Sequence, residues 1–353
     1  MLIKPRYTFK DLTLWTRWET LGFTFYNLIV TSLYSLLGLT FLHLPWAPIT
    51  VIGTAVAFIV SFQNNAAYGR IWEARKIWGG IVNPSRTGGV QVNHLVNTAH
   101  AHEPASEAEL NTHRTALIYR HIAWLTALRH AMREIKPWEV YSHSKSNREW
   151  AEQMCIPEQQ STLESDLTPY LSPEEKREVL SRTHKATALL DLQAKHLQAL
   201  KSKGLLWEFS LLEMHQLLAE CLTLQGQSER IKNFPYPKQY ASLSYYFVRI
   251  FILLLPFGAI PEFIDISQKL SAQHPLLSPY FVWLSVPFCV LASWVFYTME
   301  RIGRAGENPF EGTPNDVPIS TISRGIEIDL REMLGERPEQ IPRPYPTLHD
   351  VQM

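Results

Sequence analysis

A stretch without charged residues, from Thr20 to Gly69, dominates the polarity pattern of the chain: it holds no Asp, Glu, Lys or Arg. A helix that crosses a bilayer needs about 20 apolar residues, so this stretch is long enough for two crossings. Pro45 and Pro48 divide it near the middle. The pattern predicts a transmembrane hairpin with helices over Phe23–Leu44 and Ile49–Phe62.

The second of these helices is expected to leave the bilayer and continue into a charged segment. Gly69 is the only strong helix breaker before about Trp78, so we expect one helix up to that point. Gly79–Ala105 then contains two Gly-Gly pairs and Pro84. These residues predict turns, the last of them ending at Pro104.

The middle of the chain predicts a block of soluble helices. Apolar residues recur near a period of 3.6 over Glu107–Lys136, and Pro173 at a first helical position begins a helix that reaches about Lys203. Leu205–Ile231 predicts another long helix. Pro137–Ser172 is polar and aperiodic, and we interpret it as a surface excursion.

Two further apolar runs, Tyr240–Ile260 and Pro279–Met299, are each long enough to cross a bilayer. The first carries one charge, Arg249, near an end where a long side chain can extend to the interface. A polar turn over Pro261–His274 separates them. The Pro-rich tail, Arg337–Met353, is expected to be extended and partly mobile.

The fold class that follows is an all-α membrane protein with four transmembrane helices and a cytoplasmic helical block. Lys and Arg are concentrated before the first crossing and after the second, and they are scarce in the turns between paired crossings. By the positive-inside rule, both termini and the middle block are expected to face the cytoplasm. The membrane that the helices cross is expected to be the inner (plasma) membrane of the cell. The expected divisions are residues 1–69, 70–233, 234–300 and 301–353.

Composition excludes several other classes. Lys plus Arg and Asp plus Glu both number 33, so no net positive charge favours nucleic acid as a partner. The three cysteines lie far apart, without CxxC spacing, which predicts neither a disulfide framework nor a zinc site. The first residues mix both signs of charge and are not expected to be a signal peptide. The common enzyme motifs are missing from the sequence, so no enzyme activity is predicted.

Three separated groups of residues resemble the bestrophin family of ion channels, in particular its bacterial members. They share order and spacing with the family over nearly the whole chain, except in Pro137–Ser172. The groups are Phe62-Gln63-Asn64-Asn65-Ala66-Ala67-Tyr68-Gly69-Arg70 with Glu73-Ala74-Arg75-Lys76-Ile77-Trp78 and Ser85-Arg86; Glu229-Arg230-Ile231 with Phe234-Pro235-Tyr236-Pro237 and Leu255-Pro256-Phe257; and Glu307-Asn308-Pro309-Phe310 with Asn315-Asp316-Val317-Pro318 and Ile326-Glu327-Ile328-Asp329-Leu330.

The resemblance implies a homopentamer around a central pore, with the second helix of each subunit facing the axis. The family's constriction, the neck, corresponds here to Thr54, Phe58 and Phe62. Thr54 departs from the family, in which an apolar residue is more usual. Its hydroxyl would allow water into the outermost ring of the neck. A second, cytoplasmic aperture corresponds to Phe209, where the match is poor. From the residues alone, packing of Phe58 and Phe62 inside a helix bundle is the alternative.

Rings of phenylalanine at a neck would gate by excluding water, without any charge. The positive edges of aromatic rings favour anions, and the charge-free stretch supplies no carboxylate ring for a cation filter. The family default is therefore chloride. A cation-selective pore on the same scaffold remains an alternative, and so does a membrane-anchored scaffold or sensor without conduction.

Eukaryotic members of the family bind calcium with an acidic run after the Asn-Pro-Phe motif. In this chain the matching stretch, Glu311–Asp316, keeps only Asp316 near the expected place, whereas calcium takes six to eight oxygen ligands. We therefore expect no calcium gate, no metal and no cofactor, and a structural capping role for Asp316.

Polar residues after the neck are expected to serve structure or subunit contacts. Asn64 and Asn65 would cap or bridge helices. Two interpretations are equal alternatives for Tyr68, Arg70, Glu73 and Arg75. They form either a polar network between subunits or a solvated helix face with an Arg70–Glu73 pair. Solvent or core roles, rather than metal binding, are expected for six histidines: His94, His100, His102, His113, His121 and His130.

Overall fold

The structure, a computed structural model, describes residues 1–101, 105–139, 144–271 and 274–353. In these ranges the regular elements are helices, with two isolated β-bridges near the termini. The helices are α1 Phe9–Ser35, α2 Trp46–Leu95, α3 Glu107–Arg133, α4 Lys145–Gln153, α5 Pro157–Gln160, α6 Leu163–Leu167, α7 Pro173–Ser181, α8 Lys185–Ser202, α9 Glu208–Asn233, α10 Lys238–Ser271, α11 Ser278–Phe281, α12 Ser285–Ala305 and α13 Ile319–Met333.

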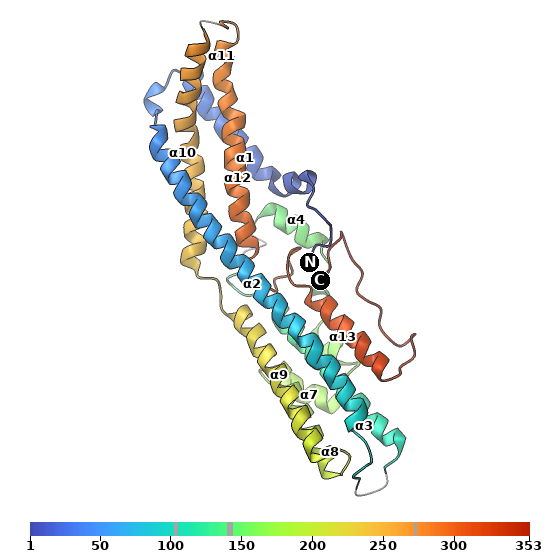
Figure 1. Cartoon of the computed structure of the whole chain (residues 1–353). Helices are drawn as coiled ribbons and strands as arrows, with labels where there is room; N and C mark the ends of the chain where they lie inside the picture. Colours follow the sequence, from blue (N-terminus) through green and yellow to red (C-terminus); the bar gives the residue numbers. More distant parts are fainter. Residues whose placement is uncertain (102–104, 140–143, 272–273) are drawn as a thin grey trace.

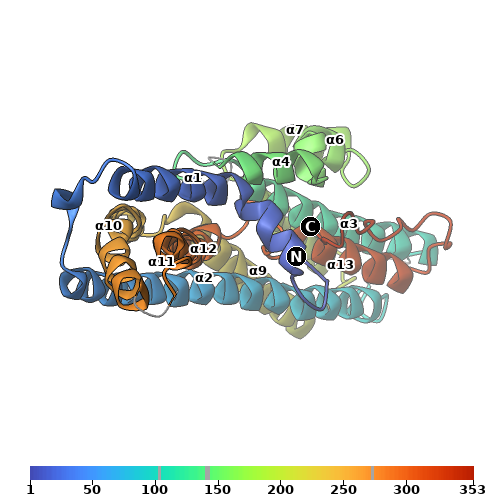
Figure 2. The ribbon, with the colours of Figure 1, turned by 90° about the horizontal axis from the view of Figure 1, so that it is seen from above.

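The single helix α2 runs along most of the elongated molecule and joins its two parts (Figure 1). At one end it packs with α10 and α12, and α1 covers the other side of those two helices (Figure 2). We call these four helices, with α2 counted from its start to Phe62, the apolar bundle. At the other end α2 packs against α3, α9 and α13, and we call that part, with α4 to α8, the helical block.

Three helical stretches are long and apolar enough to cross a membrane: Trp46–Leu95, Lys238–Ser271 and Ser278–Ala305. The helix α1, which holds most of the first expected crossing, is not among them. It begins earlier and ends earlier than Phe23–Leu44. The buried face of α1 carries several polar residues. The Asn27 amide donates to the Phe23 carbonyl of the same helix at 2.8 Å, and the Thr16 hydroxyl accepts from Trp294 of α12 at 2.8 Å.

The expectation of turns over Gly79–Ala105 is wrong as far as Leu95, because α2 continues through Pro84 to that residue. Two of the four glycines expected to break the helix, Gly80 and Gly89, are instead positions of close packing. A Cβ on Gly89 would lie 2.6 Å from Leu330 of α13, and one on Gly80 would lie 3.2 Å from Leu224 of α9. The expected turn ending at Pro104 falls partly outside the described residues.

Two other element boundaries also differ from the prediction. The polar turn expected over Pro261–His274 is helical as far as Ser271, because α10 continues through Pro256 and Pro261. The helix expected from Pro173 to Lys203 is two helices, α7 and α8, separated by 182–184. The predicted start is confirmed: Ser172 and Glu175 form a capping box before Pro173.

The segment Pro137–Ser172 is not a surface excursion where it is described. It forms α4, α5 and α6, and α5 places the side chain of Glu158 in the interior. The tail is extended as predicted, and it packs on the block: Tyr345 stacks with Arg324, and Val351 and Met353 are buried against Met154 and Ile156.

The helical block is built around large buried side chains contributed by elements far apart in the chain. Trp78 of α2, Trp124 of α3 and Phe310 are all fully buried, and the rings of Trp78 and Phe310 lie 6.2 Å apart. Burial of such side chains contributes about 1.5–3 kcal/mol each. The block therefore holds the inner half of α2 in a fixed position.

His121 of α3 lies buried against α2 and makes the stability of this block sensitive to acid. Its Nε2 lies 2.9 Å from Ser85 Oγ, which itself donates to the Ile81 carbonyl, so Nε2 is the donor. Burial lowers the pKa of His121 to about 4. Because folding lowers this pKa, protonation of His121 favours the unfolded chain. The folded block therefore has its full stability above pH 6.5 and loses stability as the pH falls towards 4.

We expect the wild type to lose about 2 kcal/mol from this group between pH 8 and pH 5. The variant His121→Gln keeps a donor for Ser85 but cannot be protonated, so its melting temperature should fall less over the same interval. Thermal unfolding of the two proteins at matched pH values measures the difference. Equal acid sensitivity of both proteins would contradict the assignment.

Candidate ion pathway

One face of α2 in the apolar bundle is packed and the opposite face is open. Gly53, Val56 and Val60 are buried, whereas Phe58 is 62% exposed and Phe62 is 70% exposed. Thr54, Phe58 and Phe62 recur every four residues, which places them on one side of the helix. Neither phenylalanine is therefore packed in the interior of the subunit; packing against another helix of a membrane bundle stays the alternative to a pore position.

Close contact with α10 fixes which face of α2 is open. A Cβ on Gly53 would lie 2.7 Å from the Phe251 ring, and one on Gly258 of α10 would lie 2.4 Å from Ile49. Only glycine permits this approach at either position. A rotation of α2 that turned Phe58 inward would bring a larger side chain into that contact.

Thr54 carries a polar group into the row of phenylalanines, and the helix itself satisfies its donor. The hydroxyl donates to the Thr50 carbonyl at 2.9 Å. Because this bond uses the hydroxyl hydrogen, the Thr54 oxygen can only accept further hydrogen bonds.

Beyond Phe62, α2 is hydrogen bonded to α12 and to the segment that follows α12. Gln63 donates to Glu307 Oε1 at 2.8 Å, and Asn64 donates to the Met299 carbonyl at 3.0 Å. Burial raises the pKa of Glu307. Asn64 thus bridges α2 and α12, whereas Asn65 is exposed.

Arg70 and Glu73 have separate partners. The Arg70 guanidinium donates to the carbonyls of Glu307, Ile231 and Phe234, at 2.8, 3.2 and 2.8 Å. Glu73 accepts from Arg230 at 2.7 Å.

The Arg70–Glu73 pair, which belonged to one of the two equal alternatives, is not formed among the described residues. Tyr68 stacks on Trp72, and Arg75 contacts the Met1 sulfur. Within one subunit the four residues Tyr68, Arg70, Glu73 and Arg75 therefore do not form a single network.

Phe209 lies near the start of α9, at the end of the block farthest from the apolar bundle (Figure 1). It is exposed, and its ring packs against Trp207 with centroids 4.7 Å apart. Apart from this contact its side chain is 62% exposed, a fraction like those of Phe58 and Phe62.

Asp316 organises the loop between α12 and α13. Its carboxylate accepts from the backbone N–H groups of Phe310, Gly312 and Val317 at 2.7–2.9 Å, and from Arg133 at 3.0 Å. Phe310 and Gly312 have positive φ angles of 74° and 85°. These four hydrogen bonds use both carboxylate oxygens, and Arg133 supplies the positive charge beside them.

Metal ligation has no support in the described residues, where no group of three or more His, Cys, Asp or Glu side chains could hold a metal ion. His113 and His196 form a pair, with Nδ1 and Nε2 3.1 Å apart. His130 bonds Asp166 at 2.9 Å. His102 lies outside the described residues.

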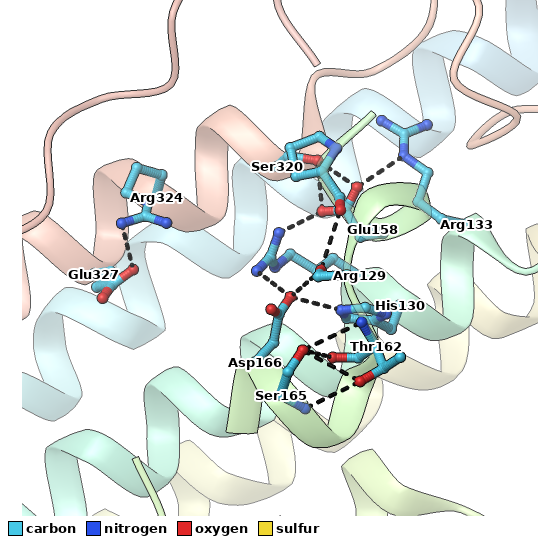
Figure 3. Close-up of polar contacts among 12 residues, drawn as sticks. Arg129, His130, Arg133, Glu158, Thr162, Ser165, Asp166, Ser320, Arg324 and Glu327 are labelled. Atoms are coloured by element: carbon cyan, nitrogen blue, oxygen red, sulfur yellow. Dashed lines mark hydrogen bonds and ion pairs between the residues drawn. The ribbon is translucent and has the colours of Figure 1, made fainter. Parts of the chain in front are cut away.

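A buried ionic cluster was not predicted from the sequence (Figure 3). Glu158 of α5 lies between Arg129 and Arg133 of α3, and Ser320 of α13 donates to both of its oxygens at 2.7 and 2.9 Å. Burial would raise the pKa of Glu158, but the two guanidinium charges outweigh it and hold the pKa below its ordinary value.

Comparison with known proteins agrees with this architecture over almost the whole chain. The family model for the bacterial and fungal bestrophin proteins matches residues 15–269 and 275–332. The voltage-dependent anion channel-forming protein YneE of Escherichia coli K12 is 25% identical over 336 residues, which cover 90% of this chain and 92% of that protein. A protein of the same description from Ralstonia nicotianae, RSc3414, is 25% identical and covers 95% of both chains.

Solved structures show the same fold. The crystal structure of a bacterial bestrophin homologue from Klebsiella pneumoniae superposes with a TM-score of 0.67 at 22% identity, over 91% of this chain and 99% of that one. The family model covers far more than half of the residues, including the open face of α2 and the loop around Asp316. The chain therefore belongs to the bacterial and fungal bestrophin family.

Proposed function

We propose that the chain forms a passive anion channel, a homopentamer in which the open face of α2 lines a central pore. The observation that carries the proposal is the row Thr54, Phe58 and Phe62, which is uncovered in the subunit although its residue types are apolar or nearly so. Uncovered apolar side chains on a helix that crosses a bilayer face lipid or a neighbouring subunit. In the proposed pentamer, five copies of both phenylalanines facing one axis would form a narrow apolar constriction.

Related proteins support the choice of ion. The relatives from Escherichia coli and Ralstonia are described as anion channel-forming. In this chain α2 contains one acidic residue, Glu73, and Arg230 neutralises it. A proposed wall with so little negative charge favours anions such as chloride over cations.

The topology proposed for each subunit has four crossings with both termini in the cytoplasm. α1 would be the fourth crossing, because it packs along α12 and α10 over the apolar bundle. A helix with one side against two others can cross a bilayer with fewer apolar residues than an isolated one. The inner membrane of a bacterial cell is the proposed location.

The test is the reversal potential of the purified protein in a planar bilayer under a KCl gradient. A shift to the chloride equilibrium potential supports the proposal, and a shift to the potassium potential would reverse its selectivity. A protein that is confirmed as monomeric or dimeric, and silent, would instead support a membrane-anchored scaffold.

Calcium removal is expected to leave the currents unchanged. Asp316 is already satisfied by three backbone donors and Arg133, so the loop after the Asn-Pro-Phe motif needs no cation to hold its shape. Currents measured with a calcium chelator and with added millimolar calcium should superimpose. A loss of current in the chelator would contradict this assignment.

A further inference from the structure

The open face of α2 continues beyond the row of Thr54, Phe58 and Phe62 into the helical block. Trp72, Lys76, Asn83 and Thr87 are exposed there. Lys76 follows Phe58 by five helical turns at 3.6 residues per turn, so both side chains lie on the same side of the helix. At 1.5 Å per residue, Lys76 lies about 21 Å beyond Phe62 along the helix axis.

Among the charged residues of α2, Lys76 is the one with no hydrogen bond or ion pair to the described residues; Arg75, its neighbour, contacts the Met1 sulfur. Arg70 donates to backbone carbonyls, Glu73 pairs with Arg230, and Arg86 pairs with Asp329 at 2.7 Å. In the described residues no hydrogen bond or ion pair engages the exposed Lys76 ammonium. An unpaired cation on an otherwise uncharged face contributes its full charge to the space in front of it.

We propose that Lys76 determines anion preference and conductance, as a ring of five ammonium groups in the water-filled vestibule on the inner side of the neck. This inference rests on the proposed pentameric channel. A wall of low dielectric focuses the field of such a ring and raises the local concentration of anions that enter the neck. The ring acts together with the neck phenylalanines, which carry no charge.

Of the acidic residues in α9, Glu229 is level with Lys76, but it is only partly exposed and accepts a hydrogen bond from the buried Gln225 at 2.9 Å. The exposed acidic residues Glu220 and Glu213 lie farther along the helix. α9 runs antiparallel to α2, since Gly80 faces Leu224 and Gly88 faces Leu217. The exposed Glu220 is thus level with α2 residues about 12 Å beyond Lys76, and Glu213 is farther still. Both separations exceed the Debye length of about 8 Å at physiological salt.

Charge reversal tests the proposal. Lys76→Glu should lower the chloride-to-potassium permeability ratio and the single-channel chloride conductance, each about threefold at low salt. Both effects should shrink at 1 M salt, where the Debye length is about 3 Å. Lys76→Gln should give a smaller change in the same direction. Arg177→Glu, the same change on an exposed side chain of α7, is the matched control and should leave both quantities unchanged.

Two outcomes would overturn the assignment of Lys76. One is an unchanged reversal potential and conductance in Lys76→Glu pentamers. The other is a loss of pentamers that the double variant Lys76→Glu, Glu220→Lys restores, because Lys76 would then be a subunit contact. Failure of the channel proposal is distinguishable, since it would appear as no current in the wild type. A cation-selective wild type would correct the ion assigned to the channel, while a shift in Lys76→Glu would still support the ring.

Discussion

Channels with Phe62→Ala are expected to pass several times the single-channel current of the wild type. Phe62 is 70% exposed on the open face of α2, and in the proposed pentamer its five copies form the inner ring of the neck. Truncation to alanine removes five aromatic rings from the constriction, so it becomes wider and wetter. Phe58→Ala, one turn away, should act in the same direction.

Phe25→Ala on α1 is the matched control for this experiment. Phe25 is 69% exposed in the same bundle, but it lies on α1, on the far side of α10 and α12 from α2 (Figure 2). It should leave conductance unchanged. Wild-type currents through intact Phe58→Ala and Phe62→Ala pentamers would remove both residues from the pore.

Glu158→Ala is expected to be among the most destabilising single changes in the helical block. The Glu158 side chain is fully buried, and those of Arg129 and Arg133 are 8% and 2% exposed. Removing the carboxylate takes the shared counter-charge from Arg129 and Arg133 and leaves the Ser320 hydroxyl without its acceptor. Each arginine keeps one other acidic partner, Asp166 at 3.5 Å and Asp316 at 3.0 Å. Loss of one partner that leaves a buried charge uncompensated costs about 3–5 kcal/mol, so we expect a loss at the lower end, about 3 kcal/mol.

Thermal unfolding of the detergent-purified protein measures this loss. Glu174→Ala is the control: it removes a carboxylate of the same kind from an ion pair with Arg177 that is 77% exposed on both sides. Such surface pairs contribute at most about 1 kcal/mol. Equal melting temperatures for the two variants would show that the cluster around Glu158 is not needed to hold α3, α5 and α13 together.

The sequence predicts those parts of the fold that depend on continuous local patterns. The charge-free stretch locates the start of α2 to within a few residues, and the helix-start residues at Ser172 locate α7. Glycine is ambiguous in such patterns, because the same residue that breaks a helix permits close packing of two helices. Gly80 and Gly89 serve the second purpose, and α2 is therefore longer than predicted.

Long-range partners are the part that the sequence could not supply. Glu158 lies in a polar, aperiodic segment, and its burial depends on two arginines of α3 and a serine of α13. Lys76 is one of several basic residues after the charge-free stretch, and only the three-dimensional structure separates it from its paired neighbours. The period of 3.6 places it on the face of Phe58, but it does not show which face is open.

The continuity of α2 makes it a mechanical lever between the two parts of the subunit. Its 50 residues span about 75 Å, and Pro84 falls in the half held by the block, so the part that carries the neck has no internal hinge. A tilt of only 5° about one end would displace the other by about 6 Å. In the proposed pentamer, small rotations of the helical block would therefore change the diameter of the neck, with no separate moving part between the two.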